Sequence, residues 1–235
     1  MKSISPPILV TGCPRSGTSL IAGILNVCGC FFGKVDRMME NIKIREKIIK
    51  PYFLYDLRTD ASGYNDFPIT EKVFEYLEQV DFNLRGRIKG VLLEQGWDWG
   101  CWGYKDSRTL LSWPLWVDVF PEALWVVVCR DEKEVLYSCE KTVYVRGSIV
   151  SGINGQLGGD NWLQAVKMMY AGYLQKISEL KSNNHVKVIE IWPNKIVNNQ
   201  DYTYIKKVVD VAGLSWNLEA VQNFINPKIW KNHEN

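Results

Sequence analysis

The sequence predicts an α/β fold of three layers, in which a central parallel sheet of about four to five strands is flanked by helices. Strands are predicted at residues 8–11, 102–105, 123–129 and 186–191, and those at 8–11 and 123–129 have the composition of buried strands. Longer segments with helical periodicity separate them. Strands that alternate with helices build parallel sheets covered on both faces.

The first half of the chain begins with a strand that the Pro6-Pro7 pair introduces. A Gly-rich turn follows, and the apolar face of the next segment predicts a helix. Further helical periodicity ends at Pro51. In chain order we expect a turn at 12–17, a helix over 18–28, a helix over 38–50, a surface loop at 58–68 and a helix over 70–84, which the apolar stretch 88–93 can continue.

The second half alternates in the same way, with Pro121 breaking one helix and Asp131 capping the next through Cys139. Five glycines in 147–161 predict a long loop, which could act as a lid over a binding site. The remaining helices are expected at 109–119, 162–181, 201–213 and 217–225.

Length and composition limit the class of protein. The 235 residues fit one domain, and we expect 1–235 to form a single one. The 46% of hydrophobic and 23% of charged residues are typical of a globular protein. The net charge is only +2, so no extended basic surface is expected for nucleic acid or for an anionic membrane.

No membrane partner and no metal site are expected. The first residues lack the apolar region of a signal peptide, and no stretch approaches about 18 apolar residues. We therefore expect a soluble, cytoplasmic protein. The six cysteines lack the paired spacing of a zinc site, which favours free thiols and no metal. Trp97, Trp99 and Trp102 are expected in the core, with an acceptor or adenine contact as the alternative.

The most informative segment is residues 8–20, ILVTGCPRSGTSL, which leads from a strand into a helix. Backbone N–H groups and a helix N-terminus in this context bind phosphate. Gly12, Gly17 and Ser19 match the P-loop pattern, but Thr18 stands where that pattern has lysine. The positive charge lies within the loop instead, at Arg15, which argues against hydrolysis of a nucleoside triphosphate and favours another anion.

This segment resembles the 5′-phosphosulfate loop of sulfotransferases, whose P-loop-like fold and sulfuryl donor, 3′-phosphoadenosine 5′-phosphosulfate (PAPS), are thereby implied. By this resemblance, the donor-binding residues of the loop are Pro14, Arg15, Ser16, Gly17, Thr18 and Ser19.

Two further segments extend the resemblance. Arg130 follows the predicted strand 123–129, at the end where open α/β sheets bind ligands, and Ser138 lies eight residues later. The family places a 3′-phosphate on such an arginine and serine. Residues 103–108, GYKDSR, are similar to a Lys-Asp-Pro segment of bacterial-type and tyrosyl-protein sulfotransferases, with Ser107 in place of proline. This similarity implies that Lys105 stabilises the transferring group, and Arg108 is a weaker candidate.

Transfer to a hydroxyl or amine acceptor needs a proton acceptor. His185, in a turn, and His233, near the chain end, are unsuited by position. A carboxylate is expected instead, in the order Glu40, Glu46, Asp36. The sequence thus predicts a nucleotide-binding, PAPS-dependent sulfotransferase with Arg15, Lys105, Glu40 and Glu46 as catalytic candidates and no metal.

The acceptor could be a small molecule, a glycan or a peptide, and the oligomeric state is not predicted. Two alternatives stay open: a P-loop nucleotide or nucleoside kinase, which the threonine at position 18 disfavours, and a non-catalytic relative that binds an adenosine bisphosphate.

Overall fold

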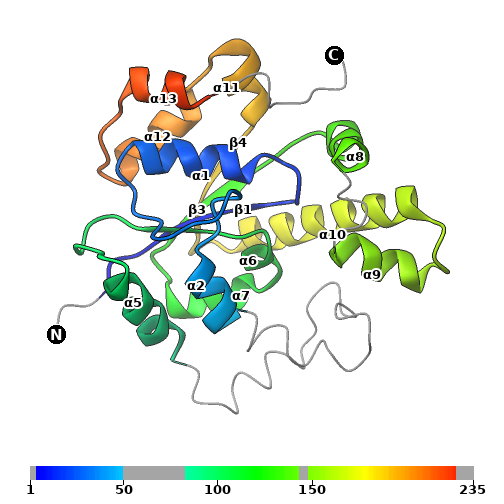
Figure 1. The fold of residues 1–235 in the computed structure, drawn as a ribbon, viewed down its shortest axis with the longest axis horizontal. Coiled ribbons are helices and arrows are strands. Elements are labelled where there is room, and N and C mark those ends of the chain that lie inside the picture. Colours follow the sequence, from blue (N-terminus) through cyan, green and yellow to red (C-terminus); the bar gives the residue numbers. More distant parts are fainter. Residues whose placement is uncertain (1–3, 50–82, 143–147, 226–235) are drawn as a thin grey trace.

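The computed structural model describes residues 4–49, 83–142 and 148–225. At its centre lies a parallel sheet with the strand order β2-β1-β3-β4 (Figure 1). The strands are β1 Ile8–Gly12, β2 Gly103–Lys105, β3 Leu124–Val128 and β4 Lys187–Ile191. This confirms the α/β fold class and all four predicted strands. Each strand begins and ends within one residue of the predicted position.

Helices cover both faces of this sheet and form the two outer layers (Figure 1). They are α1 Thr18–Val27, α2 Ile42–Ile44, the π-helix η1 Arg45–Ile49, α5 Leu84–Glu94, α6 Arg108–Leu111, α7 Trp113–Val119, α8 Glu132–Lys141, α9 Ser148–Gln156, α10 Trp162–Ser182, α11 Pro193–Asn199, α12 Thr203–Val211 and α13 Leu218–Phe224. Within the described ranges, no helix is both long and apolar enough to cross a lipid bilayer.

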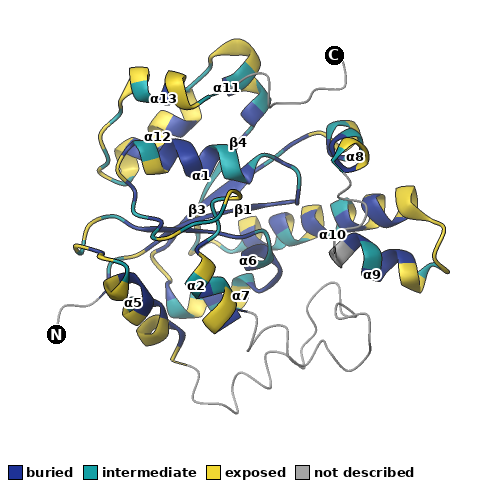
Figure 2. Cartoon of the chain, in the orientation of Figure 1, coloured by how far each residue is buried: buried dark blue, intermediate teal, exposed yellow. Residues whose placement is uncertain are grey.

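Alternation along the strands divides the core in two. Ile8 and Val10 of β1 face a cluster formed with α1, α11, α12 and α13. Leu9 faces the other way, together with Tyr104 and Trp125, into a larger cluster with α5 to α10. Every residue of β1 and β3 is buried, as expected for central parallel strands (Figure 2).

Aromatic side chains fill the second cluster. Tyr104 stacks on Trp116 with ring centroids 5.4 Å apart, and Trp102 meets Phe120 edge to face at 5.6 Å. Trp97 and Trp102 are buried, which confirms the core interpretation for both. Trp99 is only partly buried and packs against this cluster.

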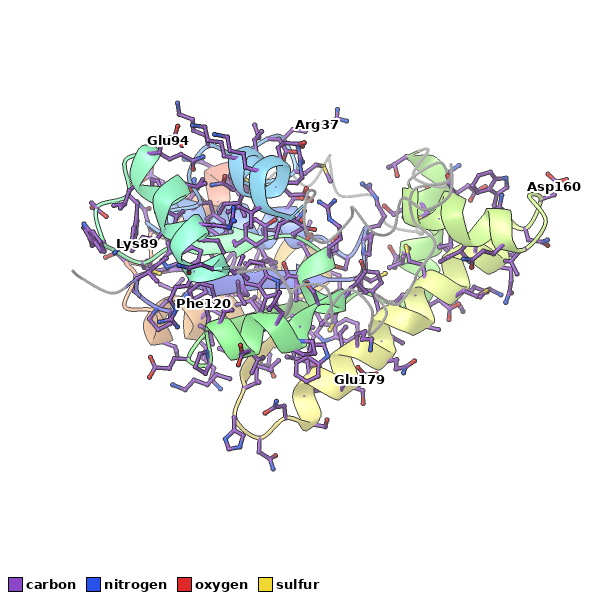
Figure 3. The ribbon with its side chains drawn as sticks, turned by 90° about the horizontal axis from the view of Figure 1, so that it is seen from below. Arg37, Lys89, Glu94, Phe120, Asp160 and Glu179 are labelled. Atoms are coloured by element: carbon purple, nitrogen blue, oxygen red, sulfur yellow. The ribbon has the colours of Figure 1, made fainter. Side chains whose placement is uncertain are left out.

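The long helix α10 extends away from the sheet and packs against α9. Figure 3 shows Asp160 at the tip of the loop that joins the two helices and Glu179 near the other end of α10. The predicted loop over 147–161 was therefore wrong for residues 148–156, which form α9. Val150 and Ile153 are buried one helical turn apart. Burial of this face outweighs the cost of about 1 kcal/mol for each helical glycine.

The predicted helix over 38–50 is shorter than expected. Residues 38–41 are not helical, because the Asp36 side chain accepts hydrogen bonds from the N–H groups of Met38 and Glu40. Such local bonds compete with helix formation. Asn41 then caps α2 by accepting from the N–H of Ile44 at 3.1 Å.

Three smaller differences concern prolines and helix ends. The predicted helix over 109–119 is divided at Ser112, because Pro114, in the first turn of α7, has no N–H to donate. The stretch 88–93 belongs to α5, which begins after its cap Asn83. Helix α11, with Pro193 in its first turn, was not predicted. The predicted loop 58–68 and residues 70–82 lie outside the described residues.

Gly12 allows β1 to approach β3 at the start of the loop. A Cβ there would lie 2.3 Å from the carbonyl oxygen of Val128, and φ is +150°. We expect Gly12→Ala to destabilise the protein by roughly 2 kcal/mol more than Gly29→Ala. The second position also has a positive φ, but nothing lies within 4 Å of its Cβ. Chemical denaturation measures the free energy of unfolding of both variants. An equal loss of stability in the two would contradict the close approach of β1 to β3.

Candidate functional site

Three predicted site segments meet at one edge of the sheet. The loop of residues 13–17 follows β1, Lys105 ends β2, and Arg130 lies just beyond β3. Val10 pairs with Lys105, and Gly12 pairs with Val128, so the carboxyl ends of the three strands are aligned. Ligands of open α/β sheets bind at this edge.

The loop has the geometry of an anion site. Arg15 has a φ of +72° and Gly17 a φ of +100°, both in the left-handed region. Gly17 is the N-cap of α1 and supplies no side chain to its first N–H groups, which have no partner within a helix. The hydroxyl of Ser16 is buried, and no described residue hydrogen-bonds to it. An anionic oxygen would satisfy both kinds of donor.

Side chains from α8 and from the segment just after β3 form hydrogen bonds with this loop. Nε of Arg15 donates to Oγ of Ser138 at 3.1 Å, and Nη1 of Arg130 donates to the carbonyl of Arg15 at 3.1 Å. Nη2 of Arg130 also contacts Glu134 at 2.9 Å. The structure therefore brings together Arg15, Arg130 and Ser138, which lie up to 123 residues apart.

Positive charge accumulates at this contact. Burial lowers the pKa of the Arg130 guanidinium, the neighbouring Arg15 lowers it further, and Glu134 opposes both effects. A bound anion would relieve the repulsion between the two guanidinium groups. Cys139 lies in the same field: burial raises the pKa of its thiol to about 11, although Arg15 and Arg130 act in the other direction.

A second cluster surrounds Glu40. Its Oε1 accepts from Nζ of Lys105 at 3.0 Å, and its Oε2 lies 3.0 Å from Nη1 of Arg45 and 3.4 Å from Nη2 of Arg108. The Lys105 side chain is only 3% exposed and that of Glu40 14%. Glu40 was predicted as a helical carboxylate, but it is a non-helical residue that links three cations.

Local hydrogen bonds hold Glu40 beside the loop. Oγ of Ser19, in the first turn of α1, donates to the carbonyl of Met38 at 3.0 Å. Asn41 donates to the carbonyl of Phe32 at 2.9 Å. Arg45 binds Asp36 at 2.6 Å as well as Glu40. The Glu40 cluster is thus joined to the N-terminus of α1 through the segment 36–41.

Asp106 holds Arg108, one of the three cations of this cluster, in place. It is buried and binds Arg108 at 2.8 Å, and it accepts from the hydroxyl of Tyr104 at 3.1 Å. Burial alone would raise the pKa of Asp106, but the charge and hydrogen bonds of Arg108 hold it below its usual range. Arg108 therefore serves as the partner of two carboxylates.

The remaining candidates lie farther out. The side chain of Glu46 is 43% exposed and contacts Nε of Arg45 at 3.0 Å. Pro14 is buried in the loop, and Thr18 is buried at the start of α1. His185 is exposed in its turn, and His233 lies outside the described residues.

Sequence reasoning missed Arg45 and the role of Asp36. The four-residue spacing of Arg130 and Glu134, around the start of α8, was a usable signal for their ion pair. Among the residues that the structure describes, no group of three or more His, Cys, Asp or Glu side chains is arranged to hold a metal ion.

Comparison with known proteins gives a consistent result. No protein-family model matches the chain. The sulfotransferase domain of the olefin synthase from Synechococcus PCC 7002 is 16% identical, with 96% of this chain and 79% of that chain covered and a TM-score of 0.55. The sulfotransferase domain of the curacin biosynthetic pathway is 14% identical, with 95% and 80% covered and a TM-score of 0.56.

A sulfotransferase from Mycobacterium avium is also similar, at 14% identity, 95% and 67% coverage and a TM-score of 0.54. These likenesses extend over almost the whole described fold. The chain therefore has the P-loop-like α/β fold of sulfotransferases, as the resemblance in the sequence implied.

The Asp106–Arg108 pair makes stability depend on pH. Because the pKa of Asp106 is lowered on folding, its contribution is present above the unfolded pKa of about 3.9 and is lost as pH falls through the lower, folded value. We expect Asp106→Asn to lose roughly 3 kcal/mol at neutral pH, since Arg108 loses a buried partner. The difference from wild type shrinks below about pH 4.

Urea unfolding from pH 7 to pH 3 measures this difference. Asp118→Asn, at an exposed position of α7, is the matched control and should change little. A constant difference between Asp106→Asn and wild type across the whole range would contradict the ionised pair.

Proposed function

We propose that the protein is a sulfotransferase that moves a sulfuryl group from PAPS to a hydroxyl or amine. The observation that carries this proposal is the contact of Arg15 with Ser138 and Arg130. It brings the loop that resembles a 5′-phosphosulfate site beside the pair that resembles a 3′-phosphate site. The sulfotransferase fold of the chain supports the same conclusion.

The donor would lie across the carboxyl edge of the sheet. Its 5′-phosphate and sulfate would accept from the N–H groups of Gly17, Thr18 and Ser19, and from the buried hydroxyl of Ser16. Its 3′-phosphate would bind Arg130 and Ser138. It would replace the present contacts of these two residues with Arg15 and Glu134. Pro14, in the same loop, is buried.

Lys105 and Glu40 are in contact, and Ser19 in the first turn of α1 bonds to the segment that holds Glu40, which supports roles for both residues in the chemistry at sulfur. The acceptor oxygen attacks sulfur, and the bond from sulfur to the 5′-phosphate oxygen breaks in line. Arg15 and Lys105 stabilise the charge on the leaving phosphate. When the donor binds, Lys105 leaves its ion pair with Glu40 and contacts the donor instead. The Glu40 carboxylate then takes the proton of the acceptor. The products are adenosine 3′,5′-bisphosphate and a sulfate ester, or a sulfamate where the acceptor is an amine.

Glu46 and Asp36 are secondary choices for the base. Glu46 is the more exposed, and Asp36 is held by Arg45. A single cytoplasmic domain, with a small-molecule, glycan or peptide acceptor and no metal, completes the proposal. The P-loop kinase and the non-catalytic relative are the outcomes that the tests below would separate from it.

Donor binding tests the first half of the proposal. We expect calorimetry to detect adenosine 3′,5′-bisphosphate binding that Arg130→Met weakens by about 10-fold to 100-fold, because a charge-assisted hydrogen bond is lost. Lys181→Met, in an exposed ion pair with Glu190, is the control and should bind as wild type does. Tighter binding of ATP with magnesium than of the bisphosphate would favour the kinase instead.

Turnover tests the second half. With labelled PAPS and a panel of phenols, alcohols, sugars and amines, we expect Lys105→Met and Glu40→Gln each to lower kcat by about 100-fold or more. The exposed ion pair of Lys43 and Glu94 provides matched controls, Lys43→Met and Glu94→Gln, which should keep full activity.

Unchanged kcat in both cluster variants would contradict their catalytic roles. Donor binding without transfer to any acceptor of the panel would favour the non-catalytic relative. Loss of donor binding in Glu40→Gln, rather than of kcat, would assign that residue to positioning of the loop.

A further inference from the structure

Two thiols meet at the amino end of β2, away from the anion loop. Cys30 follows α1, and Cys101 precedes β2. The N–H of Phe31 donates to the carbonyl of Cys101, and the N–H of Gly103 donates to that of Phe31, each at 3.0 Å. This backbone bridge holds the two Sγ atoms 3.9 Å apart.

The two thiols differ in access. Cys30 is only 1% exposed, and its Sγ contacts that of Cys101. Cys101 is partly exposed and lines an open cavity of about 420 Å³ together with Trp99, Glu122 and Lys187. A reagent from solvent can therefore reach the Cys101 sulfur first.

The two thiols also differ in acidity. The hydrogen bond with Cys30 lowers the pKa of the Cys101 thiol, although burial opposes this effect. Burial raises the pKa of Cys30 well above its usual value. An accessible thiol of lowered pKa with a second thiol in contact is the arrangement of an attacking and a resolving cysteine.

We propose that Cys101 is a redox modification site, which reacts with low-molecular-weight disulfides and is then resolved by Cys30 to a Cys30–Cys101 disulfide. This proposal does not depend on the proposed transferase activity. For the bond to form, the sulfurs must approach from 3.9 Å to about 2.05 Å, a movement of less than one bond length in each side chain.

The reaction proceeds in two exchanges. The Cys101 thiolate attacks one sulfur of the small disulfide, whose S–S bond breaks and releases one thiolate. Cys30 then loses its proton and attacks Sγ of Cys101, and the second small thiolate leaves. The protein thiols are oxidised by two electrons in total, and the small disulfide is reduced to two thiols.

The test uses oxidised glutathione and the native protein, with remaining thiols alkylated before peptide mapping by mass spectrometry. We expect a Cys30–Cys101 peptide as the principal product. Cys101 should react at least about 10-fold faster than Cys129, which is also partly buried but whose pKa burial raises to about 12.

Three variants assign the roles. Cys30→Ser should accumulate glutathione on Cys101, and Cys101→Ser should leave Cys30 reduced. Cys28→Ser, at a buried position two residues from Cys30, is the control and should still form the disulfide. Linkage of Cys30 to Cys28, or equal reaction rates of Cys101 and Cys129, would overturn the proposal.

Discussion

The candidate site depends on the hydrogen bonds that Arg15 makes with the β3–α8 segment. Its side chain reaches Ser138, and its carbonyl accepts from Arg130. These contacts exist because β1 and β3 are paired in register from Ile8 to Gly12, which brings the loop after β1 beside the residues after β3. Gly12 is needed for that approach, since a side chain there would meet the backbone of Val128. The packing of the core and the geometry of the site therefore both depend on the close approach of β1 and β3 at Gly12.

Charge is distributed around this contact in two different ways. Arg15 and Arg130 lie close enough to repel each other, with Glu134 as a partial counterion, and the arrangement is suited to a multiply charged anion. Around Glu40, by contrast, Lys105, Arg45 and Arg108 already have a carboxylate partner. In the proposed function, the first cluster binds the donor, and the second exchanges partners when the donor arrives. Such division of roles is consistent with a site for transfer between two substrates.

The sequence was sufficient for the sheet, because β1 and β3 are apolar runs typical of buried parallel strands and helical segments separate all four strands. It also pointed to Arg15, Lys105 and Arg130 from their places at or just beyond the end of a strand, and to Ser138 from its spacing to Arg130, and the structure brings Arg15, Arg130 and Ser138 together. It could not locate what depends on tertiary packing. Helix α9 forms despite its glycines, because Val150 and Ile153 are buried. The position of Glu40 depends on Asp36 and Arg45, whose bonds across the segment 36–45 leave no periodic signal.

In the proposed function, one donor molecule spans the loop of residues 13–17 and the pair formed by Arg130 and Ser138. A crystal structure with adenosine 3′,5′-bisphosphate tests it most directly. We expect the 5′-phosphate to lie within hydrogen-bond distance of the Ser16 hydroxyl and of the N–H groups of Gly17 and Thr18, and the 3′-phosphate to bind Arg130. A bisphosphate bound elsewhere, or with its 3′-phosphate turned away from Arg130, would contradict it.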